Sequence, residues 1–279
     1  SYPTSAKVVE VVGDRASVAT DYYATDLVVL DVSDPTSPTF LSTVDTPGWI
    51  RDLHAASDRV FVVCGGHQPA LRIFDVAEPA SPTLLGIFSI PPASNSVAVA
   101  GDRVWLAGYD GLKNVDVSDA GHPFVRSSYP VDDGMDLCLR GDLAYLPGLT
   151  IVDVGDPSSP TIVGGADSGE YPRSIFVAGD RAYVAAARED GALYPGGLWI
   201  FDVQDPTSPV LLGIHDMDRE PYEVWVEDDL AYIAGSGQGV IIADVQQGIT
   251  MFLVIILVSV WAGIAAGGPA EIVTKIEAM

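Results

Sequence analysis

The sequence Leu27-Val28-Val29-Leu30-Asp31-Val32-Ser33-Asp34-Pro35-Thr36-Ser37-Pro38 decides the fold, because close copies of it recur along the chain. The further copies, of which the last is truncated, are Leu71–Pro82, Leu112–Pro123, Leu149–Pro160, Leu198–Pro209 and Val240–Val245. The Asp before the Val marks the register at Asp31, Asp75, Asp116, Asp153, Asp202 and Asp244. Successive markers are 44, 41, 37, 49 and 42 residues apart, so the chain contains six units.

A second motif keeps the same register upstream of each copy and is typical of a tight hairpin between two strands. It occurs at Gly13-Asp14, Ser57-Asp58, Gly101-Asp102, Gly141-Asp142, Gly179-Asp180 and Asp228-Asp229. Gly and Asp tolerate the positive φ angles of such turns, and short apolar runs follow each of them. In unit one the strands are expected near Lys7–Gly13, Ala16–Thr20, Leu27–Val32 and Thr39–Val44. Each unit is therefore predicted to contain four short strands.

Four strands in a repeat of about 40 residues are typical of a β-propeller blade. The hairpin turn, the apolar strand and the two prolines that follow the strand recur together over about residues 5–245. In this pattern the chain resembles the LVIVD-repeat family. The resemblance implies an all-β, six-bladed β-propeller of four-stranded blades. It implies a scaffold rather than an activity, because the family has no shared catalytic signature. Unit three has Asp119-Ala120 in place of Asp-Pro, which makes its edge harder to place.

The first strands of the six units align on their turns and give two aliphatic columns. The columns are Val9, Leu53, Val97, Leu137, Ile175, Val224 and Val11, Ala55, Val99, Leu139, Val177, Val226. A period of two predicts that both columns pack between blades. The entry positions are polar instead: Lys7, Arg51, Asn95, Met135, Arg173, Tyr222, then Val8, Asp52, Ser96, Asp136, Ser174, Glu223. These positions should form polar rings at the mouth of the channel, where they either recognise a ligand or pair with each other and water.

One loop is longer than its equivalents and carries charged and aromatic residues. It lies between the second and third strands of unit five and includes Arg188, Glu189, Asp190 and Tyr194. Long polar loops on a rigid scaffold often carry binding function, although they can also be neutral insertions. The candidate ligand or partner site is therefore Arg51, Asp52, Asp136, Arg173, Arg188, Glu189, Asp190, Tyr194, Tyr222 and Glu223.

The charge is strongly acidic, with 38 Asp and Glu against 14 Lys and Arg and a net charge of −24. Such a surface repels nucleic acid, whose binding needs clustered basic residues. Solubility explains this acidity more simply than specific cation binding does.

The residues that would carry chemistry are scattered. The histidines, His54, His67, His122 and His215, fall in different parts of the repeat units, which excludes the usual metal-ligand spacings. Asp216, Asp218 and Glu220 alternate, but the glycine-centred calcium loop is missing. Cys64 and Cys138 should lie a whole blade apart, so two free thiols are expected. We expect no metal, no cofactor and no catalytic residue.

The repeat pattern stops after residue 247, and an apolar stretch without charge, Ile249–Ala266, follows. Its 18 residues would span about 27 Å as a helix, which is close to the thickness of the bilayer core. Trp261 lies toward its far end, and Gly263 and Gly267 have the spacing that lets two helices pack closely. The expected domains are a propeller over 1–247, a transmembrane helix over 248–268 and a short tail over 269–279. Alternatively, the stretch is an insertion, and Gly268–Glu277 supplies the fourth strand of unit six.

The architecture is much better specified than the activity. We expect a non-enzymatic, extracytoplasmic propeller that is anchored in a membrane and acts as an interaction module or accessory subunit of a larger membrane complex. Its partners would be membrane lipid and other membrane-protein subunits, with no nucleic acid. Ser1 stands where an initiator Met would, which agrees with an exported, processed protein or a trimmed chain. The alternatives are a hydrolase or lyase, or a small-ligand or cation-binding surface protein, that uses the channel mouth.

Overall fold

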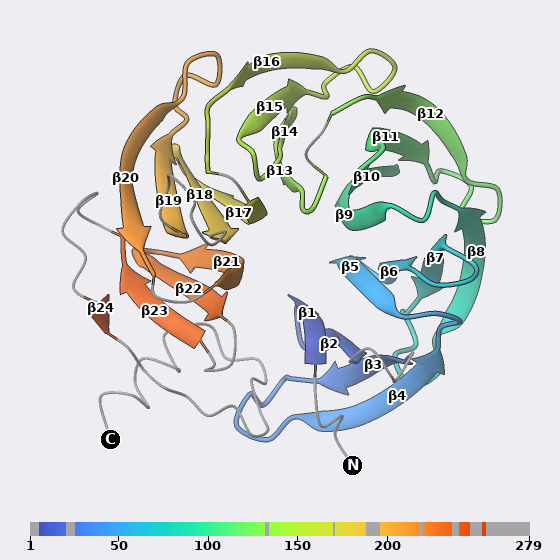
Figure 1. Cartoon of the computed structure of the whole chain (residues 1–279). Helices are drawn as coiled ribbons and strands as arrows, with labels where there is room; N and C mark the ends of the chain where they lie inside the picture. Colours follow the sequence, from blue (N-terminus) through green and yellow to red (C-terminus); the bar gives the residue numbers. More distant parts are fainter. Residues whose placement is uncertain are drawn as a thin grey trace. The chain divides into compact units, whose positions relative to one another are not determined.

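The protein is an all-β, six-bladed propeller with one four-stranded sheet in each blade (Figure 1). The computed structural model describes residues 6–20, 26–131, 134–169, 171–187, 196–217, 220–235, 240–245 and 253–254. Within each sheet, strands that are consecutive in the chain are hydrogen-bonded neighbours, as the repeat predicts.

The first three blades correspond to the first three sequence units. Blade one comprises β1 (Ala6–Val12), β2 (Arg15–Thr20), β3 (Asp26–Asp31) and β4 (Thr39–Asp45). Blade two comprises β5 (Ile50–Ala56), β6 (Arg59–Cys64), β7 (Ala70–Asp75) and β8 (Thr83–Ser89). Blade three comprises β9 (Ser94–Ala100), β10 (Arg103–Gly108), β11 (Gly111–Asp116) and β12 (Phe124–Tyr129).

The last three blades differ most in strand length. Blade four has the shortest strands: β13 (Cys138–Arg140), β14 (Leu143–Tyr145), β15 (Thr150–Asp153) and β16 (Thr161–Gly165). Blade five comprises β17 (Tyr171–Ala178), β18 (Arg181–Ala187), β19 (Gly197–Asp202) and β20 (Val210–Asp216). Blade six comprises β21 (Pro221–Glu227), β22 (Leu230–Gly235), β23 (Val240–Asp244) and β24 (Leu253–Val254).

The hairpin turn and the repeated Asp-Val are joined by the same hydrogen bond in all six blades. The first residue of each turn has a positive φ, between 51° and 61°, including Ser57 and Asp228 where glycine is replaced. The carbonyl of the Asp that follows accepts the amide hydrogen of the repeat Val, as from Val32 to Asp14, at 2.8 to 3.0 Å. The constant register of the two motifs therefore reflects a direct contact within the blade.

Many of the acidic residues close turns between the third and fourth strands. Asp31 accepts the amide hydrogen of Ser33 at 2.8 Å, and Asp34 accepts that of Thr36 at 3.0 Å. The same contacts recur in later blades, and the turn is retained in blade three despite Ala120, with His122 N bonded to Asp119 O at 3.0 Å. Side chains that accept local amide hydrogens favour turns. Part of the acidity predicted to serve solubility thus stabilises the repeated turns.

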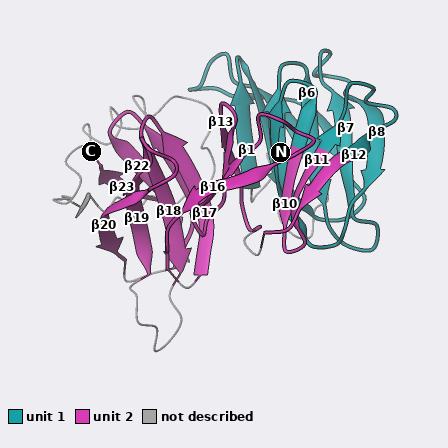
Figure 2. Cartoon of the chain, turned by 90° about the horizontal axis from the view of Figure 1, so that it is seen from above, with its two compact units in different colours: residues 1–104, 115–125, 260–279 teal, residues 105–114, 126–259 magenta. Residues whose placement is uncertain are grey.

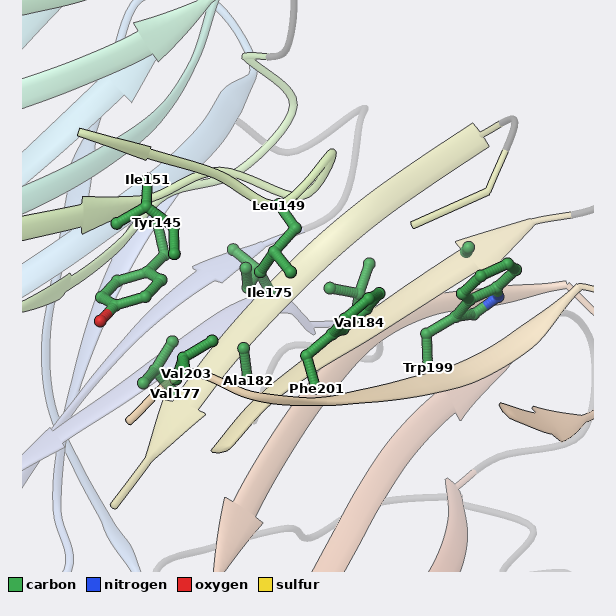
Figure 3. Packing of buried hydrophobic residues seen from close by; sticks show 11 residues of the cluster. Tyr145, Leu149, Ile151, Ile175, Val177, Ala182, Val184, Trp199, Phe201 and Val203 are labelled. Atoms are coloured by element: carbon green, nitrogen blue, oxygen red, sulfur yellow. The ribbon is translucent and has the colours of Figure 1, made fainter. Parts of the chain in front are cut away.

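The hydrophobic core lies between neighbouring sheets. Tyr145, Leu149 and Ile151 of blade four pack against a buried apolar face of blade five (Figure 3). That face is built from Ile175, Val177, Ala182, Val184, Ala186, Trp199, Phe201 and Val203. A second layer joins blades five and six, and a third joins blades one and two. Burial of each large aliphatic or aromatic side chain in such a layer stabilises the folded state by roughly 1.5–3 kcal/mol.

The first predicted aliphatic column is buried in five blades, from Leu53 to Val224, and the second is buried or half-buried in the same blades. Blade one differs, because Val9 and Val11 are 41% and 48% exposed. The two columns are therefore buried or half-buried in five of the six blades.

The outer strands contact the turn of the following blade through a small residue. Ser42 donates to Pro79 O at 2.6 Å, and Ser127 donates to Pro157 O at 2.5 Å. At the equivalent positions a Cβ on Gly86 or Gly164 would lie within 2 Å of Ala120 O or Pro206 O. Either a hydroxyl or no side chain fits here, which explains the Ser or Gly at this position in blades one to four.

The described chain divides into two compact units (Figure 2). One contains residues 6–104 and 115–125, and the other contains residues 105–114 and 126–254.

Blade six receives its fourth strand from β24, where Leu253 and Val254 pair with Ala243 and Ile242 of β23. This differs from the alternative in which 268–277 completes the blade. No helix long and apolar enough to cross a membrane occurs among the described residues. The remainder of the apolar stretch, with Trp261, Gly263 and Gly267, lies outside them.

Candidate functional site

The polar entry positions of the inner strands coincide with β-bulges. The register with the second strand shifts between Ala6 and Val8, Ile50 and Asp52, Pro172 and Ser174, and Pro221 and Glu223. The unpaired residues are therefore Lys7, Arg51, Arg173 and Tyr222. A bulge redirects a side chain that regular alternation would send to one face of the sheet.

In the first compact unit, two of these bulged residues reach the next blade. Lys7 Nζ donates to Ile50 O at 3.0 Å, and Arg51 Nη1 donates to Asn95 Oδ1. Arg51 also lies over Gly65, where a Cβ would be 2.8 Å from its Nε, and this Nε is buried without a hydrogen-bond partner. Arg51 is thus partly enclosed between blades two and three, rather than freely exposed at the mouth of the channel.

The two predicted aspartates connect neighbouring inner strands. Asp52 accepts the amide hydrogen of Leu53 at 2.8 Å through one oxygen and that of Val97, in the next blade, at 2.8 Å through the other. Asp136 repeats this arrangement with Leu137 at 2.7 Å and Ile175 at 3.0 Å. Backbone amides on the free edge of an inner strand need partners, and the carboxylates supply them.

Two other side chains extend this pattern. Ser174 Oγ accepts the amide hydrogen of Val224 at 3.3 Å, whereas Glu223 is exposed. In blade one, Glu10 Oε2 accepts the amide hydrogen of Ala55 at 2.7 Å, and its other oxygen lies 3.4 Å from His54 Nδ1. Burial opposes protonation of His54, but the hydrogen bond and charge of Glu10, with the charge of Asp52, raise its pKa overall.

In the second compact unit, exposed aromatic and polar side chains form two contacting groups near the entry ends of the inner strands. Arg173 lies 4.7 Å from the ring centroid of Tyr222 and 3.1 Å from Glu220. Tyr109 Oη donates to Met135 Sδ at 2.8 Å. Tyr109, Met135, Tyr171 and Tyr222 are 38–64% exposed. We call Tyr109, Met135, Tyr171, Arg173, Glu220 and Tyr222 the mouth patch.

The structure brings together only part of the predicted site. Arg173 and Tyr222 are in contact, whereas Asp52 and Asp136 hold separate pairs of blades. Arg188, Glu189, Asp190 and Tyr194 lie outside the described residues. Sequence reasoning did not select Tyr109 or Tyr171, although an aromatic residue in a four-residue loop and one before a strand-entry proline were available signals.

The described residues offer little for metal or nucleophilic chemistry. Among them, no group of three or more His, Cys, Asp or Glu could hold a metal ion. Both cysteines are free, as predicted, with Cys64 buried and Cys138 half-buried. Burial raises the pKa of the Cys138 thiol to about 11, so the nucleophilic thiolate is scarce at neutral pH.

The LVIVD repeat matches most of the chain, over residues 3–46, 93–131, 133–167, 169–217 and 219–247. Blade two falls between the first two matched segments, although it has the same four strands. No curated protein matches the chain.

Solved structures share the architecture at low sequence identity. A protein from Lactobacillus plantarum is 15% identical with a TM-score of 0.71, covering 91% of this chain and 84% of that one. The computationally designed Ika8 protein is 12% identical with a TM-score of 0.61, covering 88% and 73%. At these identities the likeness concerns the fold alone.

Proposed function

Because the chain belongs to the LVIVD-repeat family, a family of β-propellers, we propose that it is a non-enzymatic interaction module. It would be held on the extracytoplasmic side of a membrane by its apolar C-terminal segment, as an accessory subunit of a membrane complex. Its partner would dock on the mouth patch.

The mouth patch is the observation that carries this proposal. Tyrosine and arginine are enriched among residues that dominate binding energy, because they combine large contact areas with directional polar groups. Here the guanidinium of Arg173 is already positioned by the Tyr222 ring and by Glu220. Such pre-ordering lowers the entropy cost of binding.

The predicted acidic residues support an interaction role over catalysis. A catalytic carboxylate must reach the proton that it transfers. Both oxygens of Asp52 and of Asp136 instead accept backbone amide hydrogens.

The membrane anchor rests on residues 249–266 of the sequence. A spanning helix needs about 20 residues, so it must include Leu253 and Val254. These residues cannot be in such a helix and also pair with β23 as β24 does. Anchoring would therefore leave blade six with three strands.

Photo-crosslinking tests the partner surface. A photoreactive amino acid at Tyr222 should crosslink one discrete protein in native membranes, and Arg173→Ala should reduce the yield at least several-fold. Leu84, which is 48% exposed on the outer strand β8, is the matched control position. Equal crosslinking from positions 84 and 222 would contradict the assignment of the mouth patch.

Truncation after Gln247 tests the anchor. The full chain should remain in the membrane after alkaline carbonate extraction, and intact vesicles should leave the propeller open to protease from the extracytoplasmic side. The truncated chain should be soluble and should unfold cooperatively at nearly the same temperature. An unfolded truncated chain would mean that β24 is needed to complete blade six.

A further inference from the structure

Blade two contains a buried arginine in an apolar layer. Arg72 is only 3% exposed and lies in β7 between Ala70 and Phe74, on the sheet face that packs against blade one. The same face carries Val60, Val62 and Cys64 of β6, and blade one covers it with Ala19, Leu27 and Val29. Taking a guanidinium out of water is strongly unfavourable unless a counter-charge is present.

The described part of the chain supplies no such counter-charge. Arg72 Nη1 is buried without a hydrogen-bond partner, and no carboxylate among the described residues forms an ion pair with Arg72. Its polar neighbours are the thiol of Cys64 and, around that thiol, the hydroxyl of Thr46. Burial raises the pKa of Cys64, so the thiol stays protonated and can only donate or weakly accept.

The equivalent position in blade three shows what is missing. Lys113 occupies the place of Arg72, and its Nζ lies 2.5 Å from Asp110 Oδ2, three residues earlier. Three residues before Arg72 stands Pro69, and the loop over 65–69 contains no acidic residue. Blade three therefore carries its own anion at this position, whereas blade two does not.

We infer that Arg72, with the Cys64 thiol beside it, binds a small monovalent anion such as chloride in the layer between blades one and two. The guanidinium and the protonated thiol can both donate hydrogen bonds, which suits a guest that only accepts them. Arg72 is 3% exposed and Cys64 is 1% exposed, so a monatomic anion suits this position better than a larger one. General electrostatic attraction would not bring the anion there, because the net charge of the protein is −24.

Unfolding at constant ionic strength tests this site. Replacing gluconate by chloride from 10 to 500 mM should raise Tm by a few degrees, because an anion bound only to the folded state stabilises it. Gluconate, a much larger anion, serves as the reference. Arg72→Met should remove the chloride dependence and should be at least as stable as the wild type in gluconate. Lys113→Met, the matched control, should keep the chloride dependence of the wild type.

A second measurement uses the unmodified protein. A crystal structure in bromide should show an anomalous peak within about 3.5 Å of the Arg72 guanidinium, in the layer between blades one and two. The inference is overturned if this position holds only water, or if chloride and gluconate give the same Tm.

Discussion

The carboxylate of Asp52 in β5 accepts the amide hydrogen of Val97 in β9 at 2.8 Å and so joins the inner strands of blades two and three. Asp136 and Ile175 form the same contact between blades four and five at 3.0 Å. In both cases the second oxygen holds the amide of the next residue, Leu53 or Leu137. The repeat thus uses one acidic residue to fix both the strand and its neighbour.

Replacing these aspartates should lower stability. Asp52→Asn or Asp136→Asn presents an NH2 group to one of the two amides and leaves a donor unpaired, which should cost about 1–3 kcal/mol. Urea unfolding would measure this cost. Glu78→Gln, at an exposed acidic position in blade two, should change the unfolding free energy by less than about 0.5 kcal/mol. Aspartate variants as stable as this control would refute a structural role.

Asn114 is a fully buried amide whose oxygen and nitrogen both lack a hydrogen-bond partner. The equivalent residues of four other blades are isoleucines: Ile73, Ile151, Ile200 and Ile242. Asn114→Ile should therefore stabilise the protein by about 1–3 kcal/mol, because an unsatisfied buried amide is removed and apolar area is gained. The reciprocal Ile200→Asn should destabilise it by at least as much. Destabilisation by Asn114→Ile would indicate a buried water bound to the amide.

The blade pattern could be predicted because it is local and repeated. In blade one the expected strands near Lys7–Gly13, Ala16–Thr20, Leu27–Val32 and Thr39–Val44 differ from β1–β4 by only one residue at their ends. The turn residues and the alternation of apolar side chains carry that information along the sequence itself.

The bulges and the cross-blade contacts could not be read in this way. A bulge adds one residue without altering the composition, so the entry positions appeared to belong to one alternating strand. The partner of Asp52 is Val97, a backbone amide of the next blade, which no side-chain pattern reveals. A polar column predicted for ligand binding therefore contains inter-blade contacts as well as an exposed patch.

Two hairpin turns carry avoidable backbone strain. Ser57 and Asp228 have φ angles of 52° and 51°, at the position where the other four blades have glycine. Glycine removes the steric cost of the left-handed conformation, which stabilises the folded state by about 1–2 kcal/mol. The greater freedom of glycine in the unfolded chain offsets about 0.5–1 kcal/mol of this gain. Ser57→Gly should thus stabilise the protein by roughly 0.5 kcal/mol, and Asp228→Gly by less, because Asp tolerates this conformation better. Gly101→Ala should have the opposite effect in the same thermal unfolding assay.

The contact between His54 and Glu10 should make stability depend on pH. The folded pKa of His54 is raised, so its contribution is fully present below the unfolded pKa of about 6.5 and is lost as pH rises through the folded pKa. With the His54 side chain 30% exposed, the loss between pH 5.5 and 8.5 should be a few tenths to about 1 kcal/mol. Glu10→Gln should abolish this loss while its amide oxygen still accepts from Ala55. An unchanged pH slope would exclude Glu10 as the cause.

Arg51 and Arg173 occupy equivalent bulges but should respond differently to replacement by alanine. Arg51 donates to Asn95 and has a buried Nε, so Arg51→Ala removes packing over Gly65 and leaves Asn95 without this donor. We expect a loss of about 1–2 kcal/mol in unfolding free energy.

Arg173 has a side chain that is 33% exposed, and its ion-pair partner Glu220 is 46% exposed. Arg173→Ala should therefore change stability by no more than about 0.5–1 kcal/mol, as expected for a surface ion pair with a cation–π contact. Its effect should appear instead as reduced crosslinking from position 222. Thermal unfolding of both variants, alongside the crosslinking yield, separates the two roles. If Arg173→Ala destabilised the fold as much as Arg51→Ala, Arg173 would belong to the inter-blade contacts and the mouth patch would lose its central residue.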